Sequence, residues 1–381
     1  MLKNLYGEKR VTRTQAELNA VLAQHERFAT SRSGTRALLS MSDLTGLNLA
    51  NRTLSEADFT GASLMGASLF GSNLVHASFY CTDLQMCDLR CANLRYADMR
   101  GASFRGANLS FACMDYADLR VAMMMLVSRG SVSFVDHSVA SGEQACGVDF
   151  TNCSMKKVSF GNAKLDGANF SGALLQGANF RGAKLSNANF DGAVLAGVNL
   201  SELAVPREAL RGCITDVTPE AKSKFEMLRA RLEAHHEWVA SDGRRGSHGV
   251  LDGEDLRPLQ ELVALRPLSA ISARNVVAVG LNFARCELQA VRFDGADLRD
   301  ADFSGADLRG ASFRGARLSH ARFDKADLRS LRLENGHVRC ADFTGAQATR
   351  DQFDNAILDV GIADLGLSAP TAAPPAMQAA G

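Results

Sequence analysis

Apolar residues recur at every fifth position over most of the chain. The recurring residue is a leucine or a phenylalanine, and a small residue, most often alanine, stands two positions before it. The most regular stretch reads GADLRDADFSGADLRGASF. A period of five fits neither an α-helix, which repeats about every 3.6 residues, nor a strand, which alternates every second residue. Each repeat is therefore predicted to form one short extended side and a turn, with the small and the large residue facing inward.

Three arrays keep this period. The first runs over 44–119, the second over 150–200 with its frame shifted by one residue, and the third over 283–343. Glycine is common two positions after the large residue, where a turn favours a positive φ angle. The register is expected to fray after the third array, and the apolar segment 256–280 lies out of frame, as degenerate coils would. The last large positions of the third array are Leu328, Leu333, Val338 and Phe343.

The spacing of phenylalanines indicates how many repeats make one coil. A coil of 20 residues, with four repeats, would stack into one column the residues Phe283, Phe303, Phe323 and Phe343. A coil of ten residues fits the residues alone as well, because Phe293 and Phe313 interleave with that set. Either coil is too small to be stable by itself, so neighbouring coils must stack to share a continuous apolar core.

The consensus A-[DN]-[LF]-x-x resembles that of the pentapeptide-repeat family. The resemblance covers all three arrays and implies a right-handed quadrilateral β-helix with four repeats per coil. The expected fold class is therefore an all-β solenoid. Two short α-helices are expected to cap it.

Two segments of the chain have a helical period. Thr14 and Glu17 have the spacing of a capping box at the start of the first segment, and Pro219 stands at the first helical position of the second. The two segments align, LNAVLAQHERFATS with LRARLEAHHEWVAS. We infer two copies of one unit, a helix followed by a β-helix, with each helix covering an open coil end. The aligned His25 and His235 are interpreted as packed structural histidines, each bonded to a carbonyl.

These patterns predict the organisation of the whole chain. We expect a helical cap over 1–40, a β-helix over 41–205 that is interrupted at 125–147, a linker over 206–255 with a capping helix at 219–240, a second β-helix over 256–362, and a disordered tail over 363–381.

Composition restricts the environment and the partners. Lysine plus arginine and aspartate plus glutamate both number 42, so no bulk attraction to nucleic acid or to an anionic membrane is expected. No apolar run is long enough to insert into a membrane, and the first residues lack the apolar core of a secretory signal. Nine cysteines without disulfide or zinc spacing favour a reducing, cytoplasmic location.

Catalytic motifs are absent from the sequence. It holds no P-loop, no G-x-S-x-G and no H-E-x-x-H, so we expect neither an enzyme nor a cofactor, a metal or a small-molecule substrate. The interruption of the first β-helix is the one candidate site, a loop that would bind a partner. Its candidate residues are Arg129, Phe134, Asp136 and His137.

The function predicted from these features is a non-catalytic scaffold for protein partners. A rigid solenoid can vary its outward residues without disturbing its core, which suits such a surface. A homodimer through coil ends or helices is left open. The family resemblance implies one alternative, because its quinolone-resistance members resemble B-form DNA in size and negative charge, bind DNA gyrase and use projecting loops. The neutral, charge-alternating surface predicted here fits DNA mimicry poorly.

Overall fold

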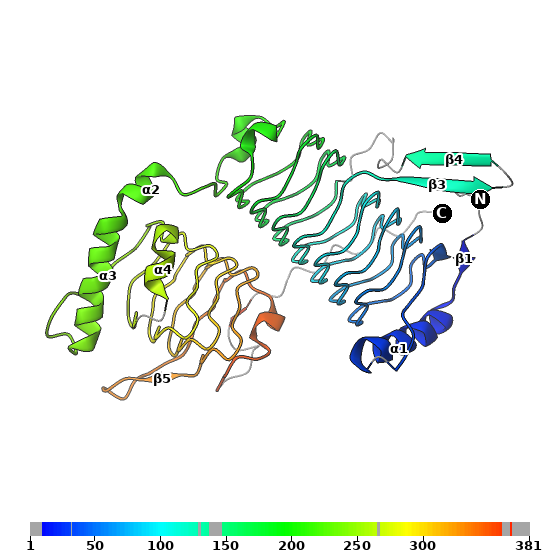
Figure 1. Ribbon diagram of the computed structural model, residues 1–381. Helices are drawn as coiled ribbons and strands as arrows, with labels where there is room; N and C mark the ends of the chain where they lie inside the picture. The colour runs from blue at the N-terminus through cyan, green and yellow to red at the C-terminus, as the bar shows by residue number, and fades with distance from the viewer. Residues whose placement is uncertain are drawn as a thin grey trace, which may run out of the picture. The chain divides into compact units, whose positions relative to one another are not determined.

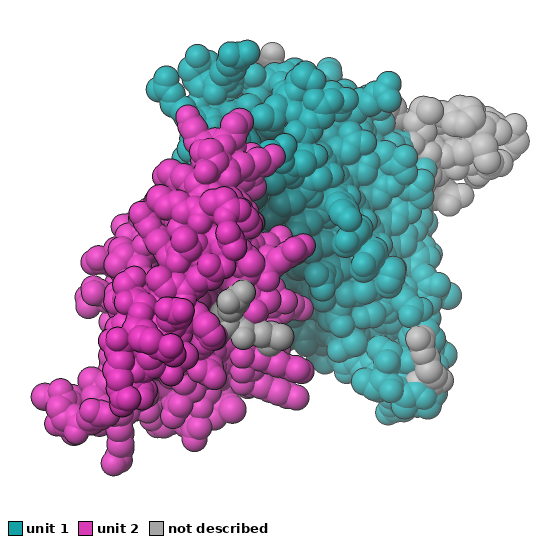
Figure 2. All heavy atoms as spheres, turned by 60° about the vertical axis from the view of Figure 1, so that its left-hand side comes forward, with its two compact units in different colours: residues 1–216 teal, residues 217–381 magenta. Residues whose placement is uncertain are grey.

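The chain forms a β-helical solenoid in two compact units, residues 1–216 and 217–381 (Figure 2). The computed structural model describes residues 10–31, 33–128, 131–136, 147–264, 267–359 and 366–367. In each unit a helix near the beginning is followed by stacked coils (Figure 1). The predicted tail, 363–381, lies almost entirely outside the described residues.

Backbone bridges between coils decide the coil length that the sequence left open. Parallel bridges join residues 20 positions apart, such as Asp43 with Ser63 and Ser63 with Asp83. Each coil therefore has four sides of five residues. The bridging residue is the polar one that stands between the two inward residues, and its neighbours complete the link. The amide of Leu44, for example, donates to the Ser63 carbonyl at 2.8 Å.

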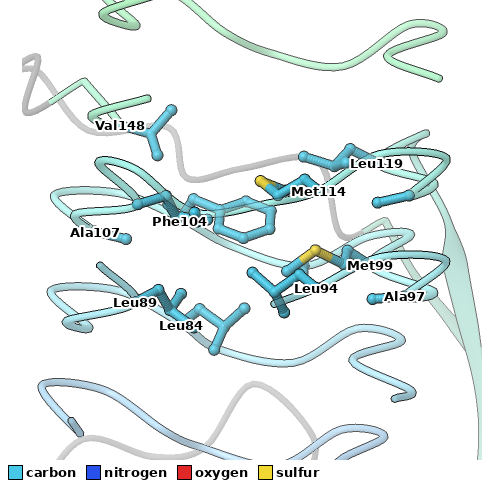
Figure 3. Packing of buried hydrophobic residues seen from close by; sticks show 14 of the residues in the cluster. Leu84, Leu89, Leu94, Ala97, Met99, Phe104, Ala107, Met114, Leu119 and Val148 are labelled. Carbon is cyan, nitrogen blue, oxygen red and sulfur yellow. The ribbon is translucent and has the colours of Figure 1, made fainter. Parts of the chain in front are cut away.

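The inward residues form the core, as predicted. Leu84, Leu89, Leu94 and Met99 point into the coils and are fully buried (Figure 3). A small inward residue can be polar when its hydroxyl or thiol donates a hydrogen bond to a carbonyl of the neighbouring coil. The Thr82 hydroxyl donates to the carbonyl 23 residues earlier at 2.7 Å, and the same contact is made by Ser72, Cys87, Cys213 and Cys286.

The corners have the left-handed backbone that was expected of the glycines. Gly61 and Gly66 both have φ near +66°. Residues other than glycine also adopt positive φ at many corners of both units, among them Tyr96 and Tyr116 with φ of 59° and 64°. Glycine suits this backbone best because it has no Cβ to clash, but the coil holds other residues in it too.

Unit 1 begins with a strand and a helix. Strand β1 (Val11–Thr12) pairs in parallel with β2 (Ser42–Asp43), and α1 (Gln15–Ser31) lies between them in sequence. The predicted capping box is present, because the Thr14 amide donates to the Glu17 carboxylate at 2.7 Å and the Glu17 amide donates to the Thr14 hydroxyl at 3.3 Å. Leu18 and Leu22 of α1 are fully buried in the same apolar cluster as the coils.

Unit 2 begins with two consecutive helices where one was predicted. Helix α2 (Pro219–Ser223) is capped by Thr218, and α3 (Phe225–Ala240) follows after a break at Lys224. Leu228 and Leu232 of α3 belong to the core of unit 2. In the described part of the chain the remaining short helices are η1 (Leu200–Glu202), η2 (Arg207–Leu210), η3 (Arg257–Leu259), α4 (Gln260–Val263) and η4 (Arg350–Phe353).

A buried histidine joins helix to coil in the same way in both units. His25 Nδ1 accepts the backbone N–H of Ala37 at 3.0 Å, and His235 Nδ1 accepts that of Gly249 at 3.0 Å. Both rings are fully buried. The histidines are thus structural. The partner of Nδ1 is a backbone N–H, which was not predicted. Backbone carbonyls also lie near the rings, that of Ser55 at His25 and those of Leu268 and Ser269 at His235, so the predicted carbonyl contact is not contradicted.

The first two arrays of repeats form a single stack. Asn108 bridges Asp149, and Asp118 bridges Ser159, so the coils continue in register across the interruption. The inserted residues include a hairpin of β3 (Met123–Ser128) and β4 (Ser131–Asp136).

The third array contains a second hairpin, which corrects the predicted columns. Strands β5 (Leu331–Arg332) and β6 (Val338–Arg339) pair with each other, and Ser312 bridges Asp342 across a longer interval of 30 positions. Leu333 and Val338, predicted to face inward, are 40% and 57% exposed.

The hairpin also changes which aromatic rings stack. Phe323 does not stack on Phe343 as predicted; Phe313 stacks on Phe343, and Phe323 on Phe353, both with ring centroids 4.7 Å apart. Phe353 is buried, so the core continues after Phe343, where fraying was expected. The out-of-frame segment 256–280 is also part of the coils. Val277, for example, bridges Asp255 and Asp297.

Candidate functional site

The interruption of unit 1 forms an antiparallel hairpin. Strands β3 and β4 make a two-stranded sheet, drawn as a pair of arrows beside the coils in Figure 1. The register places Met125 opposite Phe134 and Val127 opposite Val132. Residues directly opposite each other in such a pair share one face of the ribbon. The sequence thus assigns apolar residues to successive positions of that face.

The four predicted site residues divide into two pairs. Phe134 and Asp136 lie on β4, at positions opposite Met125 and Met123. Arg129 and His137 lie outside the described residues. The structure therefore places two of the four on one strand, two positions apart.

Acidic side chains on the coil faces are paired with arginine in a regular way. The Asp88 carboxylate accepts two hydrogen bonds from the Arg90 guanidinium, both of 2.8 Å. Such paired charges cancel within one side of a coil. The same two-residue spacing recurs with a short ion pair at Asp98–Arg100, Asp118–Arg120, Asp255–Arg257, Asp297–Arg299, Asp307–Arg309 and Asp327–Arg329.

One surface of unit 1 was not identified from the sequence. His76, Tyr96 and Tyr116 occupy the same corner of three successive coils and stack on one another, with ring centroids 4.9 and 5.0 Å apart. The ammonium of Lys157 lies 5.5 Å from the Tyr116 ring centroid in the next coil. We call the three rings the aromatic ladder. The sequence does show these aromatic residues at intervals of 20 positions. That spacing indicates that they are neighbours only once the coil is known to contain 20 residues.

A buried acid lies beside the aromatic ladder. The Asp115 side chain is 1% exposed and accepts hydrogen bonds from the Ser154 hydroxyl at 2.5 Å and the Lys156 amide at 3.0 Å. Arg95 Nη2 and Lys156 Nζ lie 3.2 and 3.5 Å from its carboxylate. Burial opposes its ionisation, but Lys156, Ser154 and Arg95 outweigh burial and lower the pKa of Asp115.

Several cysteines are buried in the coils, whereas Cys340 is exposed. Cys87, Cys153 and Cys286 are buried at the small inward position, as predicted. Burial raises the pKa of Cys81 to about 12 and that of Cys113 to about 11, so these thiols stay protonated and are poor nucleophiles. None of the eight cysteines in the described part of the chain forms a disulfide.

The described residues lack two kinds of feature. No group of three or more His, Cys, Asp and Glu side chains in these segments is arranged to hold a metal ion. Within the same segments, no helix has the length and apolar character needed to cross a membrane.

Several solved structures share local features with the chain. A pentapeptide repeat protein from the thylakoid lumen of Arabidopsis thaliana is 26% identical over 32% of this chain and 66% of its own length, with a TM-score of 0.21. QnrB1, a plasmid-mediated fluoroquinolone resistance protein, is 17% identical over 51% and 92%, with a TM-score of 0.26. HetL, from the cyanobacterium Nostoc sp. strain PCC 7120, is 21% identical over 90% and 91%, with a TM-score of 0.15. TM-scores this low do not guide a functional assignment.

Sequence comparison gives the family. No curated protein matches the chain. The family described as pentapeptide repeats matches in eight copies, over residues 42–79, 87–121, 147–182, 173–203, 268–305 and 292–329. These segments together cover just over half of the sequence, and their five-residue period is the one that the coils display. The chain therefore belongs to the pentapeptide-repeat family.

Proposed function

We propose that the protein is a non-catalytic interaction scaffold whose β3–β4 hairpin contacts a protein partner. The observation that carries this proposal is the register around the hairpin. Asn108, Cys113 and Asp118 form parallel bridges with the coil that follows the insertion, as residues of uninterrupted coils do. The solenoid therefore does not need the hairpin for its own stacking.

The composition of the hairpin supports a partner-binding role. An isolated two-stranded hairpin is marginally stable in water, and an exposed apolar patch on a soluble protein commonly marks an interaction site. The sequence MMLV, residues 124–127, pairs with VSFV, residues 132–135, in this ribbon. Contact with a partner would add further apolar contacts to this marginally stable element.

Other features agree with a scaffold in a reducing compartment such as the cytoplasm. The described cysteines form no disulfide, and burial keeps thiols such as Cys81 protonated. The ion-paired coil faces of each unit present hydrogen-bonded charges, which favour solubility.

The test replaces residues 122–147 with one repeat, Ala-Asp-Leu-Arg-Gly. Asp118 and Ser159 then stand 20 positions apart, which is the spacing of bridged residues elsewhere. The full chain and this variant are used as baits in lysate of the native host, and the captured proteins are compared by mass spectrometry. We expect the replacement to abolish capture of the specific partner while the circular dichroism spectrum stays that of a β-helix.

A matched control removes the other hairpin. Deletion of 331–340 joins Ser330 to Ala341 and creates the regular sequence ADLRSADFTG. This variant should capture the same partner as the full chain. Retention of every partner by the 122–147 replacement would contradict the proposal, and self-capture lost with the replacement would identify the partner as a second copy.

The gyrase-binding alternative is less well supported. The gyrase-binding members of the family imitate the negative charge of DNA. In this chain, carboxylates such as Asp88 and Asp307 are neutralised by an arginine two residues later. We expect no inhibition when the full chain is added to a gyrase supercoiling assay. Inhibition that disappears with the 122–147 replacement would favour that alternative over a general scaffold.

A further inference from the structure

The aromatic ladder of unit 1 is a surface feature that the coil does not require. Tyr96 and Tyr116 are 49% and 46% exposed, and His76 is exposed as well. Both tyrosines stand at corners with positive φ, where a bulky side chain is strained and glycine is not. Equivalent corners elsewhere in unit 1 are occupied by glycine, as at Gly66 and Gly101.

The stacking decides which part of each ring can meet a ligand. Tyr96 lies between His76 and Tyr116, and Tyr116 lies between Tyr96 and the ammonium of Lys157. Both faces of each tyrosine ring are thus occupied. About half of each tyrosine stays exposed, and because the faces are covered, a ligand would meet the ring edge, which carries a positive partial charge and ends in the phenol hydroxyl.

Cations flank these edges. Arg95 precedes Tyr96 in sequence, and the Lys156 carbonyl accepts the Tyr116 N–H at 2.9 Å. Both side chains are held by the buried Asp115. Lys157 adds a third positive charge at the end of the ladder. Glu56 occupies the same corner one coil before His76. With Asp115 and Glu56 as two carboxylates against three cations, the ladder and its flanks carry a small local excess of positive charge in a protein whose net charge is zero.

We propose that this surface binds an extended, carboxylate-rich segment of a partner protein. Ring edges, phenol hydroxyls and cations all attract carboxylates, and tyrosine and arginine are the residues enriched at protein interfaces. Single-stranded nucleic acid fits less well, because its bases bind by stacking on open ring faces, and here the tyrosine faces are covered. The site is separate from the β3–β4 hairpin, so it stands or falls independently of that proposal.

Fluorescence anisotropy with fluorescein-labelled decaglutamate, at low salt, tests the site on the full chain. The double substitution Tyr96→Gly and Tyr116→Gly should raise the Kd about tenfold or more, the loss expected when central interface residues are removed. The melting temperature should not fall, because glycine is unstrained at these corners. A ladder with a purely structural role would show the opposite pattern, a lower melting temperature and unchanged binding.

Two further variants complete the design. Met86→Gly is the matched control, because Met86 is another exposed corner residue, with φ of 58°, outside the ladder, and it should leave the Kd unchanged. Lys157→Gln keeps both tyrosines and should weaken binding and reduce its salt dependence. An equal loss in Met86→Gly, or none in either ladder variant, would overturn the proposal.

A labelled oligothymidylate of ten nucleotides separates the two classes of anion. The proposal expects it to bind more weakly than decaglutamate and to be insensitive to the double tyrosine substitution. Tighter oligothymidylate binding that is lost in that variant would reassign the surface to nucleic acid and overturn the proposal.

Discussion

At the scale of single residues, His25 and His235 link protonation to the attachment of each helix. The Nδ1 atom of each ring accepts a backbone N–H, from Ala37 and Gly249, and can do so only when it carries no proton. Burial lowers the pKa of both, to about 4 for His235, where the nearby His248 acts in the same direction. Protonation of either ring therefore opposes the folded state.

We predict that unit 2 loses stability when the pH falls from 7 to 5. Unfolded histidine has a pKa of about 6.5, so the contribution of His235 is fully present above that value and is lost as the pH falls toward 4. The difference in the free energy of unfolding between pH 7 and pH 5 should be about 2 kcal/mol. Thermal unfolding followed by circular dichroism at both pH values measures it.

The substitution His235→Asn isolates this effect, because the asparagine Oδ1 can still accept the Gly249 N–H but does not titrate in this range. Its unfolding should depend less on pH than that of the original chain. His236→Asn, at the exposed neighbouring position, serves as the control and should retain the full dependence. Identical pH profiles for His235→Asn and the original chain would show that another group is responsible.

At the scale of elements, we predict that helix α3 stabilises unit 2 by covering the apolar end of its coils. Leu228 and Leu232 lie in the core cluster of that unit. Leu232→Asp should destabilise unit 2 by at least about 3 kcal/mol, because it removes a buried leucine and places a charge among apolar side chains. Chemical denaturation and the soluble yield report the effect.

The control substitution is Met227→Asp, on the exposed side of the same helix. It should change the free energy of unfolding by less than about 0.5 kcal/mol. If Leu232→Asp were equally mild, the helix would not be covering the coil end.

The two hairpins show where prediction from sequence succeeded and where it failed. The insertion before the second array shifts the five-residue frame by one position, so the interruption was visible. The β5–β6 insertion adds ten residues, a multiple of five, and leaves the frame unchanged. Leu333 and Val338 therefore matched the inward position by spacing alone, although they lie on the surface. A five-residue period identifies the repeat, but it does not show whether a given repeat belongs to a coil or to an insertion.

The aromatic ladder was missed for a related reason. Packing restricts the inward positions to small or apolar residues, so these positions can be recognised in any single repeat. Corner residues such as Tyr96 and Tyr116 face solvent and vary from repeat to repeat. Their proximity appears only when the chain is wound 20 residues to a coil. The core could thus be predicted almost completely, whereas outward neighbours required the structure.

At the scale of the whole molecule, the two units have separate cores. One apolar cluster includes residues from Leu18 to Leu203, and the other includes residues from Leu228 to Leu367. Among the described residues, neither cluster contains a side chain from the other unit. Solenoids are stabilised by contacts between adjacent coils, so cooperativity should extend through each stack and end where the stack ends.

We therefore predict two separable unfolding transitions, each sensitive to substitutions in one unit. Phe170 stacks between Phe150 and Phe190, and Phe303 between Phe283 and Phe323, all with ring centroids about 5 Å apart. Replacing either central ring with alanine should cost about 3–5 kcal/mol and lower the midpoint of its own transition by roughly 10 °C. Calorimetry of Phe170→Ala and Phe303→Ala should therefore move different transitions. A single transition lowered by both substitutions would mean that the units unfold as one, and that coupling between them, rather than stacking within each, sets the stability of the chain.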